Sequence, residues 1–177
     1  MTMDNMKTAV ANLADLADRQ LASLVDTRYN NGLPSNLSAS CDERRYINHG
    51  FKAVQIGASA YTAEALKHTM PASVFSRSTE CHNQDKVSMG TIAARDSLRV
   101  LQLTEQVLAS TLLAAVQGVR IRIEQGELNH DTLAPNLMAM YDDISGYFDN
   151  LVEDRPLEGV LRFTIDAIQA KRWSLYE

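Results

Sequence analysis

The sequence has few cysteines and no recognisable export signal. Cys41 and Cys81 are the two cysteines of the 177 residues, and they stand far apart without the C-x-x-C spacing of a redox or zinc site. The amino terminus does not combine a basic start with an uninterrupted apolar run, which is the pattern of a signal peptide. The composition therefore predicts a reduced, cytoplasmic protein.

Positive charge and long apolar runs are also scarce. There are 17 basic against 22 acidic residues, giving a net charge of −5, and no basic stripe that would neutralise nucleic-acid phosphates. The longest mostly apolar stretch, residues 107–119, is interrupted by Ser110, Thr111 and Gln117 and falls short of the roughly 20 residues that a membrane span needs. We expect neither nucleic-acid binding nor a membrane span.

Helical periodicity runs through almost the whole chain. With 45% hydrophobic residues the chain can bury a core, and we predict one helical domain over residues 1–177. Apolar residues recur at three- and four-residue steps, whereas alternating strand patterns are nearly missing. The fold class predicted is all-α, a bundle of long helices. Helices are expected over residues 3–28, 46–67, 86–125, 131–148 and 157–172.

The third of these segments is unusually long. Residues 86–125 contain no proline, so a continuous helix would reach roughly 55–60 Å at about 1.5 Å per residue. Its apolar side chains occupy more than one face, whereas a surface helix of a globular protein shows a single stripe. This pattern indicates burial within a bundle between subunits, hence a homo-oligomer.

Two polar segments interrupt the helical pattern, at residues 29–37 and 78–85. From patterning alone, Glu80 and Asp85 could simply flank and cap the long helix. Cys81 beside His82 suggests a nucleophile and a base, but no third orienting group is visible. His82 has no partner at metal-ligand spacing, and we predict no metal.

The two segments resemble the carboxyl-terminal half of the aromatic amino acid ammonia-lyases and 2,3-aminomutases. The resemblance rests on Tyr-Asn-Asn-Gly-Leu-Pro-Ser-Asn-Leu at 29–37, on Gly-Phe-Lys-Ala at 50–53, on Glu-Cys-His-Asn-Gln-Asp at 80–85, and on Val-Ser-Met-Gly at 87–90. The motifs stand in family order, and the resemblance covers nearly the whole chain. The resemblance implies an oligomer, tetramer-like, that acts on an aromatic amino acid.

The same resemblance implies a set of site residues. In the family, the glutamate, asparagine and glutamine of the second segment face substrate and electrophile, which carries over to Glu80 and Gln84 as catalytic residues and to Asn83 as a substrate- or cofactor-binding residue. Gln84 stands where the histidine-specific branch has a glutamate, so it favours tyrosine or phenylalanine. A helix beginning near residues 86–88 would also place its positive end beside this segment.

The family's electrophile is 4-methylideneimidazol-5-one (MIO), formed from an internal Ala-Ser-Gly. That tripeptide does not occur in the 177 residues, and Ala58-Ser59-Ala60 lacks the necessary glycine. The resemblance begins after the family's amino-terminal domain, so the chain is expected to carry no cofactor of its own and to obtain the MIO group from a partner segment.

Three hypotheses follow for the chain. It is a subunit of a divided MIO enzyme, a piece of a longer enzyme without turnover of its own, or a non-catalytic assembly or regulatory protein that reuses the lyase scaffold. In each case it is expected to be inactive alone. The sequence does not distinguish lyase from aminomutase, nor tyrosine from phenylalanine.

Overall fold

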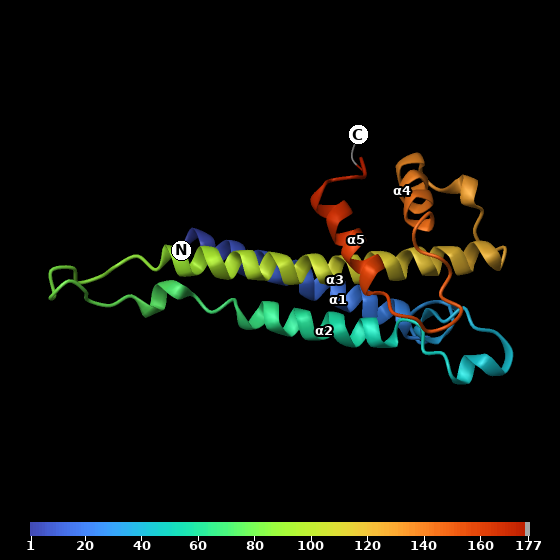
Figure 1. The fold of residues 1–177 in the computed structure, drawn as a ribbon, viewed down its shortest axis with the longest axis horizontal. Coiled ribbons are helices and arrows are strands. Elements are labelled where there is room, and N and C mark those ends of the chain that lie inside the picture. The colour runs from blue at the N-terminus through green and yellow to red at the C-terminus, as the bar shows by residue number, and fades with distance from the viewer. Residues whose placement is uncertain (176–177) are drawn as a thin grey trace.

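The computed structural model describes residues 1–175, except the side chain of Asp42. Within these residues it confirms the all-α prediction, with five α-helices joined by loops and short 3₁₀ turns. The α-helices are α1 (Thr2–Val25), α2 (Lys52–Lys67), α3 (Gly90–Glu124), α4 (Pro135–Ser145) and α5 (Glu158–Gln169). The first three lie side by side along the long axis, while α4 and α5 cover one side of α3 (Figure 1).

The helices α1 and α3 run parallel and approach each other closely. Ser97, Thr104 and Thr111, spaced seven residues apart on α3, direct their hydroxyl groups at the α1 carbonyls of Met3, Val10 and Ala17, at 3.2, 3.4 and 3.1 Å. Each hydroxyl also lies 2.8–3.0 Å from the carbonyl four residues back in α3, so it shares one proton between two helices. The facing α1 residues are small, chiefly Ala11, Ala14 and Ala17, which are buried. This constant register aligns the two helices along most of α1.

The start of α2 is six residues later than predicted. Residues 42–46 form a separate 3₁₀ turn, and the chain reaches α2 through Gly50, whose φ is +53°. A Cβ at Gly50 would lie 2.6 Å from the carbonyl oxygen of Asn36, so only glycine fits. The carboxylate of Asp154 accepts the backbone N–H groups of His49 and Gly50 at 2.8–2.9 Å. A distant side chain thus defines this boundary.

The other helices were predicted in the right places, with shifted ends. The helix α1 ends at Val25, because Asp26 is extended and its carboxylate binds Arg28. The helix α3 spans 35 residues but begins only at Gly90, and its N-cap residue, Met89, makes no side-chain capping hydrogen bond. Asn129 caps the 3₁₀ turn before α4, and α4 begins at Pro135, later than the predicted start at residue 131. The buried face of α1 follows Ala11, Ala14 and Leu21, whereas Leu13 is 57% exposed.

The main core lies where α1, α2 and α3 meet the carboxyl-terminal segment. Phe51 and Phe148 pack edge to face there, with ring centroids 6.2 Å apart. Gln117 of α3, fully buried, donates to Leu37 O and Asn150 Oδ1 and accepts from Leu151 N. It therefore ties two loops to the long helix. None of the helices in residues 1–175 combines the length and apolar character that a bilayer crossing requires.

Candidate functional site

The predicted site residues lie on a hairpin between η3 (Ala72–Phe75), a 3₁₀ turn, and α3. Ser76 Oγ donates to Val87 O at 2.7 Å and accepts from Val87 N at 3.0 Å, which closes the base of the hairpin. Further out, Thr79 and Gln84 pair through two backbone hydrogen bonds of 3.0 and 3.3 Å. The hairpin, residues 76–87, extends beyond the end of the three-helix bundle (Figure 1).

Glu80, Asn83 and Gln84, the site residues that the resemblance implies, lie at the tip of the hairpin. Glu80, Cys81 and His82 have φ of 53°, 53° and 67°, the left-handed region that costs non-glycine residues of order 1 kcal/mol each. Asn83 N donates to Glu80 O at 2.9 Å and holds this turn. The side chains of residues 77–86 are all exposed, so this chain alone builds no enclosed site around them.

The predicted contribution of a helix dipole is not supported by the geometry. Because α3 begins at Gly90, the limb of residues 85–89 separates the helix terminus from Glu80 and Asn83. Helix-terminus effects decay within about one turn. Ser88 Oγ accepts from Gly90 N at 3.2 Å, so a loop residue already serves one of the first N–H groups.

The other polar segment, residues 29–37, has the structural role that its helix-stop residues suggest. Asn30 is buried, and its side chain donates to Leu24 O at 3.0 Å. Arg122 of α3 donates to the carbonyl groups of Asn30 and Asn31. Ala58-Ser59-Ala60 lies inside α2, where Ser59 Oγ donates to Asp18 at 2.7 Å. No group of three metal-ligating side chains comes together within residues 1–175.

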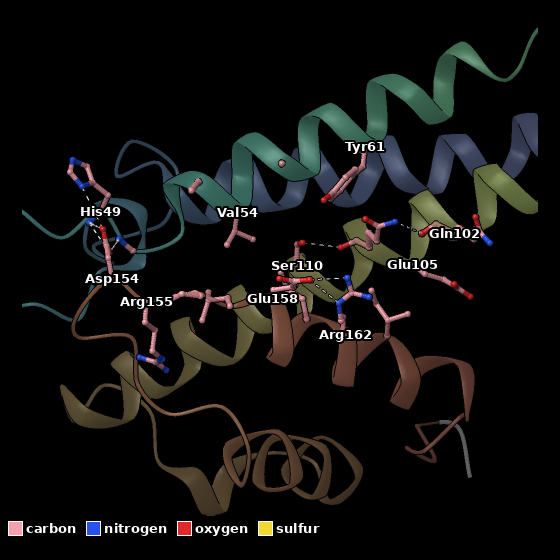
Figure 2. Close-up of a pocket in the computed structure, with 18 of the residues that line it drawn as sticks. His49, Val54, Tyr61, Gln102, Glu105, Ser110, Asp154, Arg155, Glu158 and Arg162 are labelled. Atoms are coloured by element: carbon pink, nitrogen blue, oxygen red, sulfur yellow. Dashed lines mark hydrogen bonds and ion pairs between the residues drawn. The ribbon is translucent and has the colours of Figure 1, made fainter.

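A groove of about 760 Å³ lies between α2, α3 and α5, away from the hairpin. Figure 2 shows Val54 and Tyr61 of α2 facing Glu158 and Arg162 of α5 across it. Apolar side chains of Leu157, Leu161 and Ile165 form another wall. Sequence patterning did not find this groove, because its walls come from three segments that only the tertiary fold brings together.

The charged side chains of the groove already have partners. Glu158 and Arg162 form an ion pair at 2.7 Å, and Gln169 donates to Glu105 at 2.7 Å. Asp154 is bound to the start of α2, and Arg155 donates to two backbone carbonyls. A reaction site needs polar groups that converge on a substrate. Among the described residues, the charged groups of the groove already have partners, so they do not form such a convergent set.

Comparison with known proteins agrees with this fold and these motifs. Residues 1–145 match the aromatic amino acid lyase family. The tyrosine ammonia-lyase of Cereibacter sphaeroides is 38% identical over 157 residues, which are 89% of this chain and 29% of that protein. A histidine ammonia-lyase of Geobacillus sp. is 30% identical over 174 residues, 98% of this chain and 32% of that protein.

Solved structures give the same result. Phenylalanine aminomutase of Pantoea agglomerans superposes with a TM-score of 0.86 at 30% identity, over 95% of this chain and 31% of its own. Tyrosine aminomutase of Streptomyces globisporus gives 0.85 at 32% identity, over 96% of this chain and 31% of its own. The fold is thus that of the ammonia-lyases and aminomutases. The chain belongs to the aromatic amino acid lyase family and spans between 29% and 32% of the length of these relatives.

Proposed function

We propose that this chain supplies the hairpin side of a shared active site in an MIO-dependent ammonia-lyase or 2,3-aminomutase for tyrosine or phenylalanine. The observation that carries the proposal is the hairpin itself. It presents Glu80, Asn83 and Gln84 together at an exposed tip, in a chain of the aromatic amino acid lyase family. An enclosed site then requires a second polypeptide segment over the tip, so the chain is inactive alone.

Each tip residue has a chemical role that its side chain can perform. The Glu80 carboxylate accepts or holds a proton beside the substrate amine. Asn83 offers an amide donor and acceptor for the substrate or the electrophile. Gln84 is neutral and therefore suits an aromatic ring without the positive charge that an imidazole can carry. The MIO group of the partner segment supplies the electrophile that reacts with the substrate.

Unpartnered apolar surface supports assembly with other chains. On α3, Leu98, Leu101 and Leu108 are 63%, 44% and 38% exposed, at the three- and seven-residue spacing of a coiled-coil seam. On α1, Leu13 and Leu16 are each 57% exposed. Stripes of this kind favour a homo-oligomer, tetramer-like, or a hetero-oligomer with the chain that carries the amino-terminal domain.

Co-expression with a chain that carries Ala-Ser-Gly and the family's amino-terminal domain tests the proposal. We expect the pair to release cinnamate or coumarate, seen as ultraviolet absorbance, or to form a β-amino acid, while each chain alone is inactive. In this pair, Glu80→Gln is expected to lower kcat by about 10²-fold or more, the usual size of a lost acid–base contribution.

Exposed residues away from the hairpin provide matched controls. Glu43→Gln on the 3₁₀ turn η2 (Asp42–Tyr46) is expected to leave kcat unchanged, and Gln125→Ala is the control for Gln84→Ala. An inactive pair would refute the proposal.

The alternative is a non-catalytic assembly protein, favoured by the groove whose charges are already paired. A complex that is stable but inactive, and whose assembly is unchanged by Glu80→Gln, would support that alternative.

A further inference from the structure

A buried positive charge lies between the two segments that lead into and out of the hairpin. Lys7, on the second turn of α1, has a fully buried side chain. Its Nζ donates to Met70 O at 2.7 Å and lies 3.2 Å from Asp96 Oδ2 and 3.4 Å from Asp4 Oδ1. Three acceptors match the three protons of an ammonium group. A buried, fully coordinated lysine is rare, because desolvation of the charge opposes it unless every proton has a partner.

The acceptors come from the segments that carry the two limbs of the hairpin. Met70 precedes η3 and the incoming limb, and Ala72 N donates at 2.8 Å to the Asp4 carboxylate. Asp96 stands in the second turn of α3, directly after the outgoing limb. Lys7 therefore connects α1, the segment that precedes η3, and the second turn of α3 at one point.

The hairpin transmits the orientation of its base to its tip. The pairs between Ser76 and Val87 and between Thr79 and Gln84 hold the two limbs together, whereas the side chains of residues 77–86 are exposed. In Figure 1 the hairpin leaves the bundle at the end where α1 and α3 begin. In the chain alone, the contacts of the segments that lead into and out of the hairpin are therefore those that can orient Glu80 and Gln84.

We propose that Lys7 is a positioning residue for the active site, acting through Met70, Asp96 and Asp4 to set the direction of the hairpin. The expected effect of Lys7 on catalysis rests on the proposed function, whereas its expected effect on the direction of the hairpin does not. An error of about 1 Å in the placement of reacting groups lowers rates by about 10²-fold. Removal of the buried charge is thus expected to reduce turnover more than substrate binding.

The first test measures the direction of the hairpin in the chain alone. In a Cys41→Ser background, nitroxide labels are placed at Cys81, on the tip, and at Ala60→Cys, on the exposed side of α2. We expect a narrow distance distribution that broadens in Lys7→Met. The control Lys52→Met, an exposed lysine on the first turn of α2, is expected to keep the narrow distribution.

A second label pair guards against loss of folding. Labels at Ala60→Cys and Gln102→Cys, with both native cysteines changed to serine, report the packing of α2 on α3 and are expected to be unaffected by Lys7→Met. If Lys7→Met does not fold, Asp96→Asn is the second variant, because it removes one charged acceptor at a position that is only partly buried. It is expected to broaden the distribution of distances between residue 60 and Cys81 in the same way. An unchanged distance to Cys81 in the folded variants would overturn the proposal.

The second test uses the two-chain enzyme. Lys7→Met is expected to lower kcat by about 10²-fold while KM changes by less than about threefold, with the complex still assembled. If Lys7→Met broadens the label distance distribution but leaves the kcat of the active pair unaltered, the positioning role is refuted. Failure of the unmodified pair to react would instead refute the proposed function, and the label distances alone would then decide whether Lys7 directs the hairpin.

Discussion

Single polar residues hold together segments of this chain that hydrophobic packing alone would not align. Gln117 joins two loops to α3, and Asp154 defines the start of α2. Asp4 is the most informative case, because its carboxylate binds both the N–H of Ala72 and the ammonium of Lys7. The Ala72 N–H and then Lys7 lower the pKa of Asp4 to about 2, although burial opposes the shift.

This pKa predicts an acid-sensitive contribution to stability. A carboxyl group whose pKa is lower in the folded chain stabilises the fold above its ordinary pKa of 3.8, and this contribution is lost as pH falls toward 2. We expect Asp4→Asn to lower the urea midpoint at pH 6 and to flatten its decline between pH 4 and pH 2. Asp149→Asn, at an exposed position, serves as the control. If the urea midpoints of wild type and Asp4→Asn decline in parallel as pH falls, this explanation is contradicted.

The hairpin is the element on which the functional argument depends, and its base is closed by one side chain. Replacing Ser76 with alanine removes both hydrogen bonds to Val87. Since a hydrogen bond contributes about 1 kcal/mol net, we expect amide exchange at Val87 to become about fivefold faster. Protection within α3 is expected to persist. Ser23→Ala, which removes an exposed hydroxyl on α1, is the control, and equal exchange at Val87 in both variants would show that Ser76 does not close the hairpin.

The helices could be predicted from the sequence, because apolar periodicity is a local property. Their ends could be predicted less well, since Asp154 lies more than 100 residues from the α2 terminus that it binds. The motif predicts Glu80, Asn83 and Gln84 as site residues. It does not predict the hairpin that displays them, because the left-handed tip and the closure by Ser76 have no local signature. Lys7 was not predicted at all. A lysine on a helix is ordinarily exposed, and only the tertiary structure shows its three buried acceptors.

At the scale of the whole molecule, the three-helix bundle leaves apolar surface uncovered. On α3, Leu98 and Leu101 are 63% and 44% exposed. If other chains cover this surface, Leu98→Glu combined with Leu101→Glu is expected to reduce the mass found by light scattering to that of a smaller assembly or a single chain, with the helical circular dichroism retained. Ile47→Glu, also at an exposed apolar residue, is expected to leave the mass unaltered. A wild-type chain that is already a monomer would contradict the prediction.

The central claim is that these helices contribute one side of an active site whose electrophile belongs to another polypeptide segment. The most direct measurement is a titration of the chain that carries Ala-Ser-Gly with this chain, with the rate of cinnamate, coumarate or β-amino acid formation recorded at each ratio. We predict that activity rises from zero, saturates at a fixed stoichiometry, and is lost with the variant Glu80→Gln, Gln84→Ala. Activity that is independent of this chain, or equal with the variant, would contradict the account.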